Sequence, residues 1–381
     1  MKTMKTIITR GLMLVSIMAV CIACGNTGRT LTSATGSIYE CLVVMNEEPL
    51  TQEQLNTVAK LSLVNEASGY TEPVTTTYDL VEAIMGADMP CMPQIEPYFR
   101  LTQVSTAQFD DMFKPTRNIL FVDINPQKYT QLKTKVSNDY WSTPQAICHI
   151  QTPSQEEFVS YWIEHGTEIR DWFVNQEIKR QMKFYRASTN KEARAILQQE
   201  GYDMLIPEDY MVIMDTILGG ATTYSLRNPI TIAPEVRFLW CCNNKGTMRR
   251  DLVVYTYPYT DENTFTLDYL NTKRDEVLSR VVSASVEGSY MGTEYKVFPP
   301  QMRAITVQED EYATEVRGLW KILDGEAMGG PYVSHTRLDQ VNGRVVTAEA
   351  FIYAAGQKKR NALRQAEAIL YTLQLPQDTI K

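Results

Sequence analysis

The chain has 381 residues, 44% of them hydrophobic, and a formal net charge of −8. This length and apolar content are sufficient for two packed cores, so we expect two globular domains. The acidic balance is unfavourable for contact with phosphate backbones or anionic lipid surfaces, so we expect no nucleic-acid partner.

The first 23 residues have the features of a secretory signal peptide. A basic start precedes the uncharged segment Gly11–Ala23, which is too short to span a bilayer core of roughly 30 Å as a helix. The segment leads into Cys21-Ile-Ala-Cys24, which resembles a bacterial lipobox, where the last cysteine is acylated and becomes the new N-terminus. We therefore predict a signal peptide over 1–23, palmitate or a similar acyl group on Cys24, and a membrane anchor. The alternatives are an ordinary secretory signal and an uncleaved anchor.

A small, polar segment over 24–37 follows, and its composition predicts a flexible tether. In Bacteroidetes surface lipoproteins an acidic cluster after the lipidated cysteine directs export to the cell surface. Here the first acid is Glu40. We therefore expect the body to face the periplasm from the outer membrane, with surface exposure as the alternative. The membrane, through the lipid, and an envelope protein are the partners we expect.

The first predicted domain, 38–200, alternates strands and helices. In chain order we predict a strand over 39–45, helices over 52–62 and 78–86 separated by a turn at Gly69–Pro73, a short helix over 105–113 with Ser105 as N-cap, a central strand over 118–124 and a strand over 145–151.

A long helix is predicted from Ser154 to Gln199, and Ser154 with Glu157 three residues later has the spacing of a capping box at its start. Apolar side chains recur every three or four positions from Phe158 to Phe173, which indicates one wide apolar face. Gly201 ends the pattern, and we place the domain boundary there.

The second predicted domain, 201–381, is rich in strands. We predict strands over 202–206, 236–241, 251–257, 289–297, 302–308, 312–322, 332–339 and 344–353, and helices over 264–281 and 358–373. Asn342-Gly343 predicts a two-residue turn that puts Val341 opposite Arg344. Such a pattern indicates an α+β fold of two domains, each a mostly antiparallel or mixed β-sheet covered by helices.

The body contains five cysteines after Cys24, and an odd number cannot all pair within one chain. They are scattered, without the density of a disulfide scaffold, and several lie in apolar strand-like runs. We therefore expect buried free thiols at Cys41, Cys91, Cys148, Cys241 and Cys242.

Several long segments resemble a Bacteroidetes lipoprotein family that is classed as a domain of unknown function, family 4837. The segments are Leu42–Met45, Met92–Phe99, Arg117–Ile124, Tyr257–Leu270, Gly288–Tyr295 and Met328–Arg337. The resemblance covers about residues 38 to 375 and implies a lipoprotein of the cell envelope. It implies no activity and no catalytic residue. The strand order of the second half also resembles a PsbP-like α/β sandwich, which is an analogy of fold alone.

Motifs that carry known chemistry are missing from the sequence. There is no phosphate-binding loop, dinucleotide-binding glycine pattern or nucleophile elbow. The three histidines, His149, His165 and His335, lack a second ligand at the spacing of a helical or knuckle zinc site. We therefore expect no cofactor, metal or catalytic residue, and interpret His149 and His165 as core residues.

One group of polar residues near the end of the chain suggests a ligand-binding site. With a period of two, His335 and Arg337 share one face of their strand, and the predicted turn puts them opposite Ala350 and Ala348. Glu315 and Arg317 lie on one face of the preceding strand. An arginine and a histidine beside small neighbours are suited to a carboxylate or similar anion. The structural alternative is an ion pair between Glu315 and Arg337.

From the sequence we therefore predict a membrane-anchored periplasmic lipoprotein that binds a partner or ligand. The alternative is a cell-envelope hydrolase whose site is assembled from distant residues.

Overall fold

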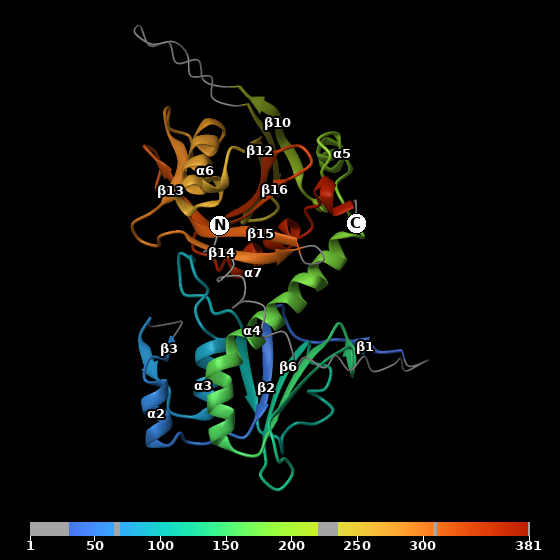
Figure 1. The fold of residues 1–381 in the computed structure, drawn as a ribbon, viewed down its shortest axis with the longest axis vertical. Helices are drawn as coiled ribbons and strands as arrows, with labels where there is room; N and C mark the ends of the chain where they lie inside the picture. The colour runs from blue at the N-terminus through green and yellow to red at the C-terminus, as the bar shows by residue number, and fades with distance from the viewer. Residues whose placement is uncertain (1–29, 65–68, 220–234, 308–310, 380–381) are drawn as a thin grey trace, which may run out of the picture.

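The computed structural model describes residues 30–64, 69–219, 235–307 and 311–379 (Figure 1). The predicted signal peptide and Cys24 lie outside this part of the chain. Within it, the fold is α+β, with a five-stranded mixed sheet in the first half and an eight-stranded antiparallel sheet in the second. This confirms the predicted fold class. None of the helices in the described residues combines the length and the hydropathy needed to cross a membrane.

The first sheet has the order β5 (Arg100–Val104), β2 (Glu40–Met45), β6 (Asn118–Ile124), β9 (Ala146–Thr152), β7 (Lys133–Asn138). Its first four strands are parallel and β7 is antiparallel to β9. One face packs against α2 (Gln52–Val58), α3 (Thr77–Met85) and α4 (Gln155–Tyr185). The other face packs against a smaller aromatic cluster that includes Phe109 and Trp141. β6 is therefore the central strand covered on both faces that its apolar sequence predicts.

Three predictions in this half differ from the structure. Ser105–Phe113 forms successive turns, because Gln108 and Phe113 each donate a backbone hydrogen bond to the residue three positions earlier and no helix propagates. The Gly69–Pro73 turn ends in β4 (Thr71–Pro73), which pairs with β3 (Ser62–Val64). Part of the predicted tether is also paired, since β1 (Thr32–Ser33) lies along β8 (Ser142–Thr143).

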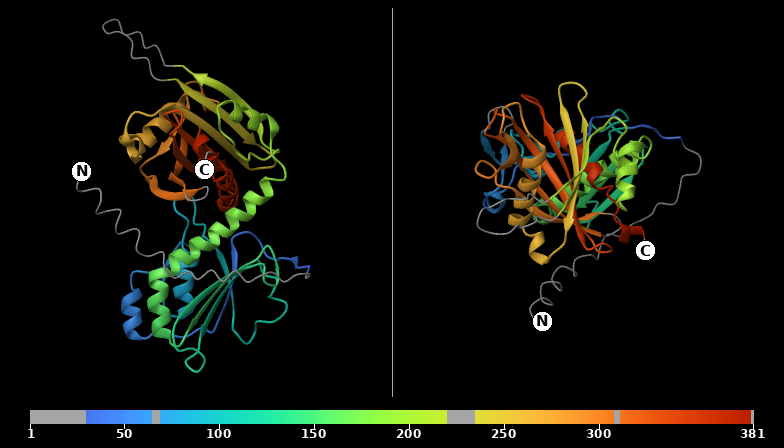
Figure 2. Two further views of the ribbon diagram at one scale, coloured as in Figure 1. Left: turned by 45° about the vertical axis from the view of Figure 1, so that its right-hand side comes forward. Right: turned by 90° about the horizontal axis from the view of Figure 1, so that it is seen from above.

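The predicted long helix is two helices. Ser154 caps α4 as expected, accepting a hydrogen bond from the Glu157 amide. α4 ends at Tyr185, and α5 (Lys191–Gln199) begins after its own cap, Asn190. A Ser-Thr-Asn sequence at 188–190 competes for backbone hydrogen bonds and interrupts the helix. Figure 2 shows α4 crossing from the first sheet to the second.

The second sheet has the order β10 (Met211–Leu218), β11 (Val236–Asn243), β12 (Arg249–Pro258), β17 (Arg344–Tyr353), β16 (Gly329–Asp339), β15 (Glu311–Leu323), β13 (Tyr290–Glu294), with β14 (Gln301–Val307) also paired to β15. The predicted strand over 202–206 is absent. Tyr202, Met204 and Ile206 alternate into the core, but Asp203 forms only an isolated bridge with Gln374, because no neighbouring strand is available.

The predicted two-residue turn at Asn342-Gly343 is wrong by two residues. Asp339 lies opposite Arg344, so four residues, 340–343, form the loop. The Asp339 carboxylate accepts hydrogen bonds from the Asn342 amide, its side chain and Arg344, which fixes the wider loop. Consequently His335 lies opposite Ala348, and Arg337 lies opposite Val346. A shift of two residues leaves every side chain on its predicted face.

Both faces of the second sheet are covered. α6 (Leu267–Val281) and residues such as Tyr255 and Phe351 form one core. α7 (Arg360–Leu370) covers the opposite face, where Ala348 and Ala350 let its backbone approach closely. α7 also packs against α4, so its core is continuous with that of the first sheet.

Candidate functional site

The four predicted ligand-binding residues lie beneath α7. Glu315 and Arg317 extend from β15, and His335 and Arg337 from the adjacent β16. Their exposed fractions are between 1% and 5%, so none of them faces open solvent. Glu315 is directly opposite His335 in the strand register. The sequence pattern therefore places them on one face, but that face is inside the molecule.

Glu315 is held by two arginines. Arg303 Nε and Arg317 Nε donate to Glu315 Oε1 at 2.7 and 2.8 Å. Burial alone would raise the pKa of Glu315, but the guanidinium of Arg317, with that of Arg303, outweighs it and holds this pKa well below its usual range. Glu315 is therefore a charged partner in an ion pair and has no proton to donate.

The network continues into α7 through Glu367. Arg317 Nη2 contacts Glu367 Oε1, and Arg364 Nη1 donates to Glu367 Oε2 at 3.0 Å. Glu367 is fully buried. Three guanidinium groups, from Arg303, Arg317 and Arg364, therefore surround two carboxylates.

Glu315, His335 and Glu367 form the group in the described residues that has the spacing of a metal site. One ligand atom from each lies within 4.8 Å of the others. Arg317 Nη2, however, is 3.1 Å from Glu315 Oε2 and also contacts Glu367, so a guanidinium occupies the space between the carboxylates. A dication would add charge where cations already exceed anions. The donor set therefore does not fit a metal ion while Arg317 is in place.

In the described ranges, the polar neighbour of the His335 ring is the Glu315 carboxylate, which lies beyond hydrogen-bond distance. Neither ring nitrogen has a hydrogen-bond partner, and Nε2 is 3.6 Å from Glu315 Oε2. The ring packs edge-on against Tyr371, with centroids 4.7 Å apart. The space expected beside Ala348 is filled by α7 and Tyr371, which closes the predicted pocket.

Arg337 has a separate partner. Its guanidinium binds Asp378 in a bidentate manner, with Nη1 and Nη2 at 2.6 and 2.7 Å from the carboxylate oxygens, and Nη1 also donates to the Leu373 carbonyl. The predicted Glu315–Arg337 pair is therefore not formed. Arg337 ties the segment after α7 to the sheet.

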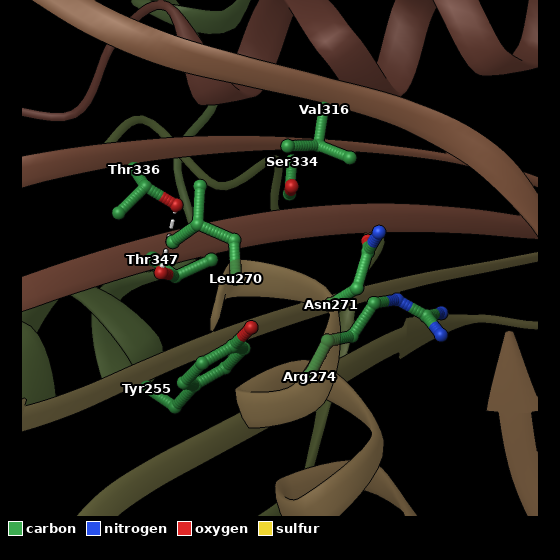
Figure 3. Close-up of a pocket in the computed structure, with 8 residues that line it drawn as sticks. All are labelled: Tyr255, Leu270, Asn271, Arg274, Val316, Ser334, Thr336 and Thr347. Atoms are coloured by element: carbon green, nitrogen blue, oxygen red, sulfur yellow. Dashed lines mark hydrogen bonds between the residues drawn. The ribbon is translucent and has the colours of Figure 1, made fainter. Parts of the chain in front are cut away.

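A small cavity lies on the other face of this sheet, beneath α6 (Figure 3). Asn271 and Arg274 from α6 and Tyr255 from β12 line it, while Thr336 and Thr347 from β16 and β17 hydrogen-bond to each other at 2.9 Å. Its volume is about 10 Å³, which is room for one water molecule. It is a packing defect between polar side chains, too small for a substrate.

Beside this cavity, Arg274 and Glu349 form a buried ion pair that the sequence did not suggest. Nε and Nη2 of Arg274 donate to the Glu349 carboxylate at 2.7 to 3.0 Å, and its guanidinium lies 3.9 Å from the Tyr332 ring centroid. Burial lowers the pKa of Arg274, but Glu349 outweighs it and raises this pKa. The two residues are 75 positions apart, so no local spacing could reveal the pair.

A larger cleft lies where residues of α4, α5 and the segment after α7 come together. Its volume is about 210 Å³. The lining includes Met182 and Arg186 from α4 and its cap, Arg194 from α5, Asp203 and Leu205 from the connection to β10, and Thr372 and Gln374 beyond α7. Among the sites described, this cleft is the one with room for a ligand.

Two family models match the chain. Residues 188–372 match a family described as Domain of unknown function (DUF4837). Residues 55–186 match a second family, Domain of unknown function (DUF8532). The curated proteins contain no match to the chain. The two matches meet between α4 and α5, beside the surface cleft.

The remaining residues that the sequence singles out are the five cysteines and two histidines. All five cysteines of the described body are free and buried, as predicted. His149 and His165, predicted as core residues, are only half-buried: His149 lies beside Phe121, and His165 lies next to Tyr161 and Glu168.

Proposed function

We propose that this chain is a lipid-anchored envelope protein whose body binds a ligand or partner and carries out no reaction. The observation that favours binding over catalysis is the closed charge network beneath α7. Its convergent carboxylates, Glu315 and Glu367, are each held by guanidinium groups and covered by a helix. A general acid or base must reach the substrate and exchange a proton with it.

The competing interpretation is an envelope hydrolase with a site assembled from distant residues. Such a site needs two carboxylates in an open cleft, one of them with a raised pKa. Glu315 has the opposite perturbation, since its arginine partners keep its pKa low. Asp203, the acid of the surface cleft, is bound bidentately by Arg194. These contacts favour binding over hydrolysis.

The anchor is supported by the lipobox-like segment that ends at Cys24, and by the resemblance to envelope lipoproteins. A single acyl chain gives marginal membrane binding, so a stable anchor requires more than one chain on that cysteine. The acidic composition offers no electrostatic attachment to add to the lipid. We propose that the body faces the periplasm from the outer membrane.

The test is metabolic labelling with radioactive palmitate, followed by separation of membranes from soluble proteins. Cys24→Ala should lose the label and leave the membrane fraction. Cys21→Leu is the matched control, because leucine is the commoner residue at that lipobox position, and it should keep both. Label that persists on Cys24→Ala would show that the anchor is elsewhere. Protease added to intact cells should leave the body uncut if it faces the periplasm.

A further inference from the structure

The surface cleft at the end of α4 has an uneven set of hydrogen-bonding groups. Arg194 Nε donates to Asp203 Oδ1 at 2.7 Å and a second bond closes the pair, so these two residues neutralise each other. The Arg186 guanidinium, in contrast, has no ion pair or side-chain hydrogen bond within the described ranges, and it is exposed. The cleft therefore carries one uncompensated positive charge.

Some of the polar groups at the rim of the cleft already form hydrogen bonds within the fold. Thr372 Oγ1 donates to the Ile369 carbonyl and accepts from the Leu205 amide. The Gln374 backbone pairs with that of Asp203, while its side-chain amide makes no hydrogen bond within the part of the chain that is described. Arg186 and Gln374 are thus the polar side chains of the lining that no side-chain hydrogen bond engages within the described ranges.

The remainder of the lining is apolar. Met182, Met204 and Leu205 contribute side chains to the cleft, and Met204 is fully buried beneath it. Methionine side chains adapt to branched apolar groups because they are unbranched and flexible. A volume of about 210 Å³ is below the roughly 300–1,000 Å³ of pockets for drug-sized molecules.

We propose that this cleft binds a small organic carboxylate with a branched apolar group, of the size of an N-acylated amino acid. The carboxylate pairs with Arg186, whose planar guanidinium matches it in two hydrogen bonds. The Gln374 amide donates to the same end or to an adjacent carbonyl, and the apolar group lies over Met182 and Leu205. The inference rests on the proposed binding function and names its ligand class.

The position of the cleft supports a ligand site. Met182 and Arg186 belong to the segment that matches DUF8532, and the lining residues from Arg194 to Thr372 belong to the segment that matches DUF4837. Ligand sites occur preferentially where two such units meet. A carboxylate bound at Arg186 would therefore contact both segments.

The experiment is calorimetric titration of the full chain in detergent with N-acetyl-leucine, compared with N-acetyl-leucinamide. The two probes have nearly the same shape, but only the first has a carboxylate. We expect a Kd on the order of 0.1–1 mM for the acid and at least tenfold weaker binding of the amide. Equal affinity for both would overturn the assignment of a carboxylate.

The variants locate the site. Arg186→Gln should weaken N-acetyl-leucine about tenfold, whereas Lys183→Gln, which removes a charge from the same helix end but does not line the cleft, should have no effect. In the ¹³C-methyl spectrum of methionine-labelled protein, the Met182 signal, assigned through Met182→Leu, should shift on titration. Equal binding by both charge variants, or an unmoved Met182 signal, would refute the site. Palmitate labelling of Cys24 is independent of these results, so failure here leaves the anchor proposal standing.

Discussion

Replacing both members of the buried Arg274–Glu349 pair should cost far less stability than replacing either one. Both side chains are inaccessible to solvent, and the pair connects α6 to β17. Removal of one partner leaves a buried charge without compensation, which typically costs about 3–5 kcal/mol. Replacement of both by apolar residues of similar volume is often neutral.

The structure ranks the two single variants. In Glu349→Leu the remaining guanidinium keeps Thr293 Oγ1, 2.9 Å from Nη1, and the Tyr332 ring, so the cost should be near 3 kcal/mol on the scale of about 3–5. In Arg274→Met the carboxylate loses all its hydrogen bonds to the arginine and must take up a proton, so the cost should be nearer 5 kcal/mol. The double variant should be within about 1 kcal/mol of the wild type.

Urea unfolding followed by tryptophan fluorescence measures these values, because Trp240 and Trp320 lie in the same core as the pair. The double-mutant cycle should give a coupling of at least about 3 kcal/mol. A double variant as unstable as the sum of the two single variants would show that Arg274 and Glu349 act independently, and the reasoning would be wrong.

Three further predictions concern other parts of the molecule. The folded-state pKa of Glu315 is depressed, so its ion pairs stabilise the protein fully above the unfolded pKa of about 4.3, and this stabilisation is lost as pH falls through the lower folded pKa. The difference in urea midpoint between wild type and Glu315→Gln should therefore shrink from pH 7 to pH 3. A difference that stays constant would contradict this prediction. Burial raises the pKa of Cys148 and Cys241 to about 12. The thiols of the body should therefore resist Ellman's reagent in native buffer and react with it in guanidinium. Rapid labelling in native buffer would refute their burial. A Cβ on Gly330 would lie 2.0 Å from the Ile352 carbonyl oxygen, so Gly330→Ala should lower the free energy of unfolding by about 1–3 kcal/mol in urea titration, and an unchanged midpoint would contradict that packing.

The sequence predicts elements well where one face is buried and the pattern is local. β6 and β17 were found from apolar runs, and the cap of α4 from Ser154. β7 and β10 are not predicted from the sequence. β7 is mostly polar and exposed, and β10 carries apolar side chains on its exposed face as well as on its half-buried face, so neither shows the polar–apolar alternation of a half-buried strand. Ser105 has the local signal of a helix cap, but no buried apolar face follows to support a helix.

The candidate site was predicted as a set of neighbours and not as a closed network. Period two places His335 with Arg337 and Glu315 with Arg317, and these placements do not depend on the hairpin register. The partners that decide their role come from elsewhere. Glu367 is 50 residues from Arg317 in the chain, and Asp378 is 41 residues from Arg337. Contacts of that range depend on how α7 packs, which no sequence periodicity encodes.

The packing of α7 makes the two halves of the chain depend on each other. The side chain of its N-cap residue, Lys359, makes no capping hydrogen bond. Glu96, from the first half, accepts hydrogen bonds from the backbone amides of Lys359 and Arg360 at 2.7 to 3.0 Å, and its charge is favourable at a helix N-terminus.

Further along α7, the Tyr185 hydroxyl at the end of α4 donates to the Gln365 carbonyl at 2.9 Å. The Arg364 guanidinium lies 5.2 Å from the Tyr98 ring centroid on one side and bonds Glu367 on the other. Without the first half, the α7 amides would lose their cap and a buried guanidinium would lose its aromatic neighbour. The two family matches therefore divide the sequence at a point where the folded molecule is held together by buried polar contacts, and the cleft beside that point is bounded by both halves.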